Sequence, residues 1–238
     1  MSITQAVIKR RKKMNIGFRI SNEKISRPPR EIVEQFRSLP VANIDDNMNR
    51  LYCVDAGIRP FNKAPLIGVA FTVKSPGGDN LMMHKAMDLA KPGDIIVVSC
   101  VGQADRSVCG EIMMRYAKKI GLAGFVIDGY IRDADGTAEL DFPVYARGIQ
   151  ANGPYKNGPG EINVPVAIGG QVVFPGDILV GDIDGIVVVR PEYAEYLISV
   201  TKTFNEKEVV TMKNIAEGKG LPRPWVDETL KAKGCQID

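Results

Sequence analysis

Near its centre the sequence reads Gly124-Phe125-Val126-Ile127-Asp128-Gly129-Tyr130-Ile131-Arg132-Asp133, an apolar, strand-like run that ends in an arginine beside a carboxylate. Glu111 precedes this run, and twenty residues separate it from Arg132. A guanidinium can pair with a carboxylate or another oxyanion, and a neighbouring aspartate can ligate a hard cation through oxygen. On spacing alone, a surface ion pair is the simpler explanation of an Arg-Asp dipeptide. The surrounding sequence therefore has to decide between the two.

The residues before this run predict a strand–helix–strand unit. Residues 94–100 are almost continuously apolar, which is typical of a strand buried on both faces. Gly110 opens a stretch with apolar residues at helical spacing, and Gly121 is placed to end that helix. Residues 123–128 form the next buried strand. Because ligands of open α/β sheets bind beyond the carboxyl ends of the strands, this unit brings Arg132 to an expected binding edge.

The rest of the chain predicts a single α/β domain with a tail at each end. Helical spacing is found over 31–39 and 81–91, and 67–74 is a strand candidate rich in β-branched residues. From Pro191 the chain becomes helical and polar. We predict a basic N-terminal extension over 1–30, a catalytic α/β domain over 31–200 and a helical C-terminal arm over 201–238. Short strands separated by turns are expected at 144–147, 164–168, 171–173, 177–181 and 185–190.

Composition excludes several classes of function. With 45% hydrophobic and 25% charged residues, the chain has the composition of an ordinary soluble globular protein. A net charge of +3 does not by itself indicate a nucleic-acid partner. The basic run Lys9-Arg10-Arg11-Lys12-Lys13 is interpreted as a solvated arm. No apolar stretch follows it as in a signal peptide, and no window has the length of a membrane-spanning helix.

The cysteines and the single histidine limit the kinds of metal site. The four cysteines show neither C-x-x-C nor zinc spacing, so we expect reduced thiols in a cytoplasmic protein. His84 is the only histidine, which excludes a histidine-rich metal site. Any bound cation would therefore be ligated mainly by oxygen.

Candidate site residues converge at the start of the helix that Gly110 opens. Gly110, Glu111, Ile112 and Met113 lie where free backbone N–H groups and the helix dipole favour a carboxylate or phosphate. Arg132 and Asp133 follow the neighbouring strand. If strand and helix are adjacent, these residues surround one small anionic ligand with a cation beside it.

A series of motifs in a fixed order is more specific than any of them alone. They are Gly68-Val69-Ala70-Phe71-Thr72-Val73, Gly78-Asp79-Asn80, Pro92-Gly93-Asp94, Gly110-Glu111, Asp128-Gly129-Tyr130-Ile131-Arg132-Asp133, Pro143-Val144-Tyr145-Ala146-Arg147-Gly148, Pro175-Gly176-Asp177 and Asp182-Ile183-Asp184-Gly185-Ile186-Val187-Val188-Val189. Over roughly residues 31–215 the chain resembles the divalent-metal-dependent pyruvate aldolases that act on 4-hydroxy-4-methyl-2-oxoglutarate and 4-carboxy-4-hydroxy-2-oxoadipate. That family also includes the regulator of ribonuclease activity A. The resemblance implies a layered α/β/β sandwich like the phosphohistidine swivelling-domain fold.

The resemblance also implies roles for particular residues. Asp133 would bind Mg²⁺ or Mn²⁺ directly, and Arg132 would contact the keto-acid end of the substrate. The amides of Gly110 to Met113 would hold the substrate carboxylate. Glu111, which stands where the described aldolases have Asp, would act on the metal through water. Glu208, or alternatively Glu206, would reach the site of a neighbouring subunit from the C-terminal arm of a homotrimer or homohexamer.

The implied activity is cleavage of a 4-hydroxy-2-oxo dicarboxylic or tricarboxylic acid to pyruvate and a second oxo acid. Oxaloacetate decarboxylation is the expected side activity, because both reactions leave negative charge on the same keto oxygen. The expected partners are the 2-oxo acid substrate and further copies of the chain, without a membrane or nucleic acid.

Three other interpretations remain open on the sequence. Lys74, at the end of an apolar strand, is the candidate for a Schiff-base aldolase, although lysines at strand ends usually extend into solvent. The spacing from Gly77-Gly78 to His84 is similar to that of phosphohistidine domains, although no nucleotide-binding domain accompanies it. A non-catalytic regulator of the ribonuclease type is the third, which the presence of Glu111, Arg132 and Asp133 disfavours.

Overall fold

The centre of the molecule is a mixed sheet of ten strands in the part of the chain that the computed structural model describes, residues 15–102 and 105–236. Its middle strands are parallel and lie in the order β3 (Leu66–Pro76), β4 (Asp94–Val101), β6 (Gly124–Ile131) and β7 (Val144–Ile149). Helix α5 (Glu111–Lys119) and the short β5 (Ser107–Cys109) connect β4 to β6. The predicted strand–helix–strand unit is confirmed. The basic run 9–13 lies outside the described residues.

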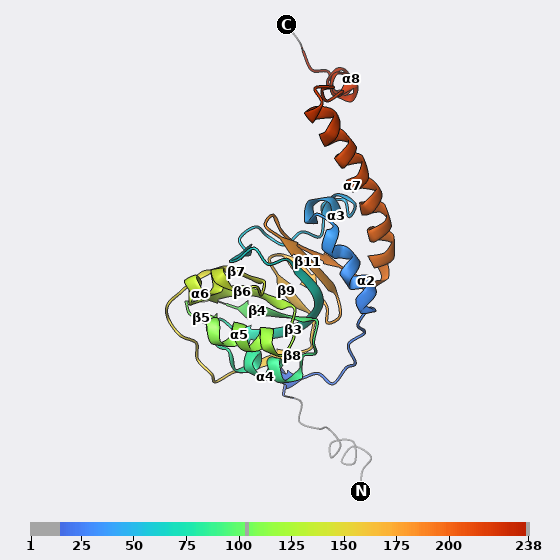
Figure 1. Cartoon of the computed structure of the whole chain (residues 1–238). Coiled ribbons are helices and arrows are strands. Elements are labelled where there is room, and N and C mark those ends of the chain that lie inside the picture. Colours follow the sequence, from blue (N-terminus) through green and yellow to red (C-terminus); the bar gives the residue numbers. More distant parts are fainter. Residues whose placement is uncertain (1–14, 103–104, 237–238) are drawn as a thin grey trace.

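The alternation of side chains along the parallel strands produces the layers of the fold. On β4, Ile96 and Val98 face a core shared with α4 (Leu81–Leu89) and α5. Ile95 and Val97 face the opposite core, shared with the short strands that follow β7. One face of the sheet is thus covered by helices and the other by strands, as Figure 1 shows. This arrangement confirms the predicted layered α/β sandwich. The covering strands are β9 (Val166–Ile168) and β10 (Gln171–Val173), which form a separate two-stranded sheet, together with β11 (Ile178–Asp182) and β12 (Gly185–Val189). β11 and β12 belong to the ten-stranded sheet, which they join where β11 pairs with β3.

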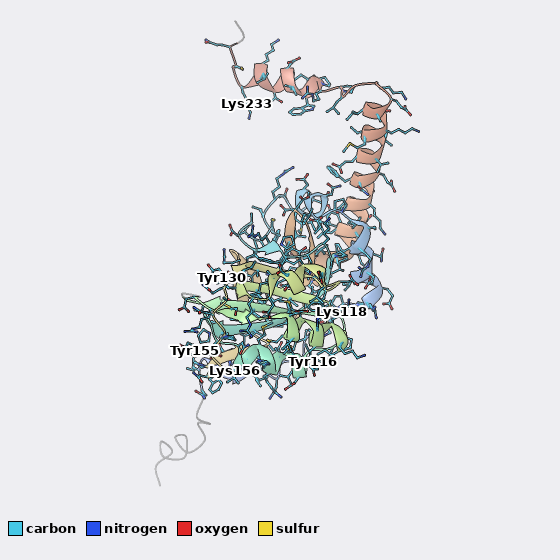
Figure 2. The ribbon with its side chains drawn as sticks, turned by 60° about the vertical axis from the view of Figure 1, so that its left-hand side comes forward. Tyr116, Lys118, Tyr130, Tyr155, Lys156 and Lys233 are labelled. Atoms are coloured by element: carbon cyan, nitrogen blue, oxygen red, sulfur yellow. The ribbon has the colours of Figure 1, made fainter. Side chains whose placement is uncertain are left out.

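A third core lies on the outer side of β11 and β12. There α2 (Arg30–Glu34), α3 (Val41–Asp46) and the first turns of α7 (Ala194–Ala216) pack against the hairpin. The remainder of α7 and α8 (Pro224–Ala232) extends away from the other elements (Figures 1 and 2). None of the helices in the described residues combines the length and apolarity that a membrane span needs.

Several short elements are not predicted by the sequence. They are too short to show a hydrophobic period, and one of them lies within 1–30. Phe18–Ile20 (β1) pairs in parallel with Gly160–Ile162 (β8), and Arg27 forms an ion pair with the buried Asp94 at 2.7 Å. The domain boundaries at 30 and 200 stay predictions. The other elements of this kind are β2 (Arg59–Pro60) and α6 (Ala134–Glu139). The 3₁₀ turns η1 (Gln35–Ser38) and η2 (Pro191–Tyr193) fall within the helical stretches predicted at 31–39 and from Pro191.

Candidate active site

Arg132 and Asp133 follow directly after the last residue of β6. The Arg132 N–H donates a hydrogen bond to the carbonyl oxygen of Cys109 on β5 at 2.9 Å, which fixes the end of the strand. Asp133 then adopts a left-handed backbone conformation with φ 61° and ψ 51°. Residues other than glycine seldom adopt it, and such outliers concentrate at functional sites. The turn directs the Asp133 carboxylate back over the start of α5.

The Asp133 carboxylate caps α5. Its Oδ2 accepts a hydrogen bond from the Glu111 N–H at 3.0 Å, where the helix dipole favours negative charge. The Nε of Arg132 lies 3.8 Å from the same oxygen. The side chains of Arg132 and Asp133 are 46% and 43% exposed, so a ligand can reach both.

Gly110 allows this close approach. A Cβ atom there would collide with the Asp133 carboxylate and would lie 3.2 Å from Cγ and Nε of Arg132. The backbone of Gly110, with φ −141° and ψ 179°, is one that any residue adopts. Glycine is therefore required at this position for space and not for conformation.

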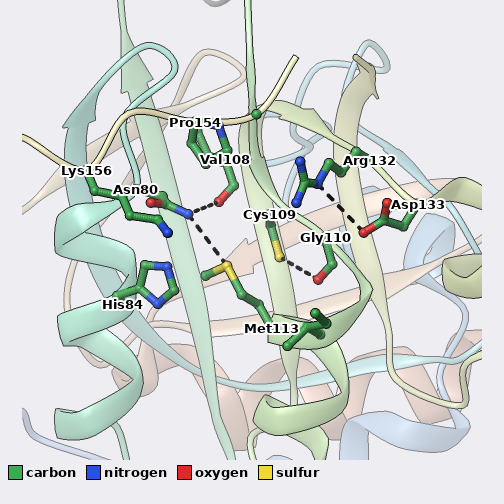
Figure 3. Close-up of a pocket in the computed structure, with 12 residues that line it drawn as sticks. Asn80, His84, Val108, Cys109, Gly110, Met113, Arg132, Asp133, Pro154 and Lys156 are labelled. Carbon is green, nitrogen blue, oxygen red and sulfur yellow. Dashed lines mark hydrogen bonds and ion pairs between the residues drawn. The ribbon is translucent and has the colours of Figure 1, made fainter. Parts of the chain in front are cut away.

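A cavity of about 340 Å³ opens beside this pair. Its volume is at the lower end of the range for small-molecule sites, roughly 300–1,000 Å³. It brings together five residues that the sequence predicts for the site: Gly110, Ile112, Met113, Arg132 and Asp133. Figure 3 shows Arg132 and Asp133 on one side and a second group of polar side chains on the other. The remaining lining residues are Asn80, His84, Val108, Cys109, Gly153, Pro154 and Lys156.

Glu111 contributes to the site through its backbone. Its carboxylate is ion-paired with Arg115 on the next turn of α5, at 2.5 Å, and does not line the cavity. Its N–H is donated to Asp133, and the Met113 N–H is donated to the Gly110 carbonyl oxygen at 3.1 Å. Two of the amides predicted to hold a carboxylate already have acceptors. A catalytic role of the Glu111 carboxylate stays a prediction and requires it to leave Arg115.

Glu206 and Glu208 lie on α7, and neither lines the cavity of its own chain. Glu208 accepts a hydrogen bond from Nδ2 of Asn43 at 2.6 Å. The contribution of either residue to a neighbouring subunit's site stays a prediction.

The oxygen ligands available beside the cavity would suit a cation that needs few protein ligands. In the described residues, no three His, Cys, Asp or Glu side chains come together as a metal cage. Asp133 Oδ1 accepts no hydrogen bond from them. Mg²⁺ characteristically binds one or two carboxylates and completes its shell with water and substrate oxygens. One carboxylate with an open oxygen beside a cavity is compatible with that pattern.

The sequence does not identify the far wall of the cavity, formed by Asn80, His84 and Lys156. Asn80 occurs in the motif Gly78-Asp79-Asn80, which gives a signal without a role. His84 is noticed only as a phosphotransfer candidate, and nothing in the sequence singles out Lys156. Partial burial and the positive charge of Lys156 lower the pKa of His84, and Asp88 opposes the shift.

Two further reactive side chains, those of Cys109 and Lys74, have structural explanations. Burial, reinforced by the charge of Asp133, raises the pKa of the Cys109 thiol far above its usual range, so this cysteine is not a nucleophile. Lys74 is exposed on β3 and lines a separate hollow with Ser75 and Glu161. It does not line the Arg132 cavity, and the Schiff-base interpretation has no support from the geometry.

The molecule is a layered α/β sandwich with a cavity, flanked by Arg132 and Asp133, at the carboxyl end of β6. The family model described as "RraA-like: Aldolase/RraA" matches residues 41–188. The chain belongs to this family, as the sequence motifs predict.

Individual relatives agree with this assignment. A Halalkalibacterium halodurans protein named "Putative 4-hydroxy-4-methyl-2-oxoglutarate aldolase" is 38% identical over 201 residues, which cover 84% of this chain and 96% of that protein. The crystal structure of an uncharacterized Pseudomonas syringae protein has a TM-score of 0.72 at 26% identity, covering 81% of this chain and 96% of the other. Streptomyces coelicolor RraAS2, described as an unusual member of the RNase ES inhibitor RraA family, also has a TM-score of 0.72. It is 28% identical and covers 79% of this chain and 99% of its own.

Proposed function

We propose that the protein is a divalent-metal-dependent pyruvate aldolase that cleaves a 4-hydroxy-2-oxo acid of the 4-hydroxy-4-methyl-2-oxoglutarate type. The observation that carries this proposal is the Arg132–Asp133 pair, which faces a cavity of substrate size at the start of α5. The printed name of the Halalkalibacterium halodurans relative supports the same reaction class.

Each residue of the pair has a part that follows from its chemistry. Asp133, whose Oδ2 accepts the Glu111 N–H, would hold Mg²⁺ or Mn²⁺. When bound, the cation supplies Lewis acidity at the keto oxygen of the substrate. The planar guanidinium of Arg132 pairs with the oxygens of the keto-acid end and orients them. The positive end of the α5 dipole favours the same anionic group.

The bond changes balance within the substrate. The 4-hydroxyl group loses its proton, the C3–C4 bond breaks, and its electron pair moves towards the keto oxygen at C2. Arg132 stabilises the negative charge that develops there, a kind of contribution typically worth about 10²–10³ in rate. C3 then takes up a proton, and pyruvate leaves. A water molecule is the acceptor of the hydroxyl proton, and Glu111 orients this water once it has exchanged its contact with Arg115. Loss of carbon dioxide from oxaloacetate uses the same stabilisation of charge.

Pyruvate release tests the proposal. We expect release from 4-hydroxy-4-methyl-2-oxoglutarate and from oxaloacetate with Mg²⁺ or Mn²⁺, and none after EDTA treatment. Asp133→Asn should abolish release. Asp135→Asn removes an exposed carboxylate two residues away, outside the cavity, and should leave it unchanged. Release that persists in EDTA, or in Asp133→Asn, would contradict the mechanism.

A second candidate function is non-catalytic binding of a ribonuclease. The likeness to Streptomyces coelicolor RraAS2 favours it. If neither substrate gives pyruvate with Mg²⁺ or with Mn²⁺, and the protein binds a ribonuclease measurably, ribonuclease binding is the better explanation.

A further inference from the structure

We propose that His84 and Lys156, supported by Asn80, form a second anion subsite that binds the distal carboxylate of a dicarboxylic 2-oxo acid. This inference rests on the proposed function, because Arg132 and Asp133 hold the keto-acid end of the same molecule on the opposite wall. The subsite makes the far carboxylate the feature that decides which 2-oxo acids are bound.

The three residues are gathered from two separate segments. Asn80 immediately precedes α4, and His84 lies one turn further on the same face of that helix, at the i+4 position. Lys156 comes from the loop after β7. All three line the cavity, and Figure 3 shows the Lys156 side chain extending towards Asn80 and His84. Arg132 and Asp133 lie across the cavity from them in the same view.

The far wall of the cavity offers hydrogen-bond donors and positive charge, and none of its three polar residues is a carboxylate that could neutralise this charge. Lys156 makes no ion pair with a described residue, and His84 and Lys156 face each other closely enough for the ammonium charge to lower the His84 pKa. The carboxylate that acts on His84 is Asp88, one turn further along α4, where it pairs with Lys85 at 3.1 Å and does not line the cavity. Asp133 is the lone carboxylate among the described lining residues, and it belongs to the other wall. A bound carboxylate would supply the negative charge that faces the Lys156 ammonium and would accept a hydrogen bond from the His84 imidazole.

Asn80 gives the wall a fixed and partly unsatisfied polar group. It is 2% exposed, and its Nδ2 donates to the Val108 carbonyl oxygen at 3.0 Å. Its Oδ1 is buried without a hydrogen-bond partner in the described structure. A buried acceptor without a donor is costly. Oδ1 therefore lacks a donor that the neighbouring Lys156 ammonium, on the same wall, can supply.

The loop that carries Lys156 is held against the start of α4 by backbone pairing. The Asn80 N–H donates to the Tyr155 carbonyl oxygen at 3.0 Å, and the Tyr155 N–H donates to the Gly78 carbonyl oxygen at 2.8 Å. Arg106 adds a second support, because its guanidinium lies 4.3 Å from the Tyr155 ring centroid and donates to the Gly153 carbonyl oxygen at 3.2 Å. Figure 2 shows Tyr155 and Lys156 together at the end of the molecule where α4 lies.

The buried Asp79 also holds the loop that carries Lys156 against α4. It is 4% exposed, and its Oδ2 accepts hydrogen bonds from the N–H groups of Asn157 and Gly158 at 2.7 and 3.0 Å. Its Oδ1 accepts one from the Leu81 N–H at 2.9 Å. One buried carboxylate thus ties the first turn of α4 to the loop. The relative position of His84 and Lys156 is set before any ligand binds, which lowers the cost of ordering on binding.

A matched pair of ligands isolates the distal carboxylate. 2-Oxoglutarate carries it, whereas 2-oxopentanoate has a methyl group in its place, and neither has the 4-hydroxyl group that cleavage requires. Binding is measured by calorimetry with Mg²⁺ present. We expect Lys156→Met and His84→Gln each to weaken 2-oxoglutarate binding by roughly 10- to 100-fold, the value of a charge-assisted hydrogen bond. Binding of 2-oxopentanoate should be unchanged in both variants. Lys119→Met, at the far end of α5 and outside the cavity, serves as the control.

The single histidine gives a second readout that does not depend on turnover. His84 is the only histidine, so its imidazole NMR resonances are assigned without ambiguity. They should shift with 2-oxoglutarate and not with 2-oxopentanoate. Equal weakening of both ligands by the variants, or an unmoved His84 resonance, would overturn the subsite. If the wild type releases no pyruvate, the proposed function fails, while a 2-oxoglutarate-specific shift at His84 would still support the subsite.

Discussion

At the scale of single residues, Asp133 combines a strained backbone, a helix cap and an open carboxylate oxygen. Its left-handed conformation turns the carboxylate onto the Glu111 N–H, and the capped helix in turn holds the carboxylate beside Arg132. Substitutions of Asp133 can therefore separate its contribution to stability from its contribution to cation binding. Asparagine tolerates the left-handed region and keeps a carbonyl oxygen that accepts a hydrogen bond.

Asp133→Asn should lose cation binding but not stability. We expect Mn²⁺ affinity, measured by electron paramagnetic resonance, to fall at least about 100-fold, since even outer-shell partners of metal sites contribute 10–100-fold. Asp133→Ala should also lower the free energy of unfolding in urea by about 2 kcal/mol, through the lost cap and the left-handed backbone. Equal stability of the two variants would argue against the cap as a stabilising contact.

Gly110→Ala tests the space on which the site depends. The added methyl group collides with the Asp133 carboxylate and presses on Arg132. A misplacement of reacting groups by about 1 Å can lower a rate roughly 100-fold. We expect a smaller displacement here, and therefore a fall in pyruvate release of at least about 10-fold. Far-ultraviolet circular dichroism should show an unchanged fold. Wild-type activity in this variant would mean that the Arg132–Asp133 pair can move without loss.

The pKa of His84 gives the distal subsite a pH dependence. Burial and Lys156 hold this pKa below the ordinary value of about 6.5, so His84 is neutral near pH 7 and gains charge as the pH falls. Protonation strengthens the attraction for a carboxylate. The affinity for 2-oxoglutarate relative to 2-oxopentanoate should therefore rise between roughly pH 7 and pH 5.5. The ratio should stay flat in His84→Gln; a ratio that is flat in the wild type would count against the role of His84.

At the scale of elements, the junction between α4 and the loop over 152–158 positions the far wall of the cavity. Asp79 is the buried link between them. Asp79→Ala should leave three amides without an acceptor and lower the free energy of unfolding by about 2–3 kcal/mol. Amide hydrogen exchange should show the loss of protection concentrated at Asn157 and Gly158. The exposed Asp88→Ala on the same helix is the control, with a change within about 0.5 kcal/mol.

The elements that the sequence predicts are those with a strong hydrophobic signal. β4 and β6 are mainly apolar runs of eight residues that are largely buried on both faces, and α5 has regular helical spacing. β1, β5 and β8 have three residues each, too few to show a period. The polar segment Ala134–Glu139 contains a glycine, and it forms α6 directly after Asp133, whose left-handed backbone turns the chain.

The site also has one half that a local sequence pattern reveals and one half that it does not. Arg132 and Asp133 are adjacent in the chain and follow a recognisable strand, so a sequence pattern exposes them together. His84 and Lys156 are separated by most of the sheet in sequence. They meet only through the Asp79 hydrogen bonds and the pairing of Asn80 with Tyr155. No local pattern encodes such a contact.

At the scale of the whole molecule, α7 is mostly unsupported by its own chain. Its 23 residues span roughly 35 Å, and its buried residues are confined to the first turns, ending at Thr201. Beyond them it exposes a series of apolar side chains that a second copy of the chain is expected to cover. The exposed apolar residues of this arm are Phe204, Val209, Val210, Met212 and Ile215.

Deleting residues 204–238 should therefore weaken self-association. We expect light scattering after size-exclusion chromatography to show a trimer or hexamer for the full chain and smaller species for the shortened one. The deletion leaves the buried start of α7 in place, so each subunit should remain folded by circular dichroism. An unchanged mass would place the subunit contacts elsewhere.

Mixing two inactive variants tests whether the arm completes a neighbouring site. If Asp133 acts in its own subunit and Glu208 acts in the next, Asp133→Asn and Glu208→Gln should each be inactive alone. Glutamine at 208 can still accept the hydrogen bond from Asn43, so the arm should keep its local contact. Co-expressed mixed oligomers contain sites in which an intact Asp133 meets an intact Glu208 from a neighbour, and a fraction of the pyruvate release should return. Glu206→Gln in place of Glu208→Gln distinguishes the two acids. Full activity in Glu208→Gln alone, or no recovery on mixing, would confine the catalytic groups to one chain.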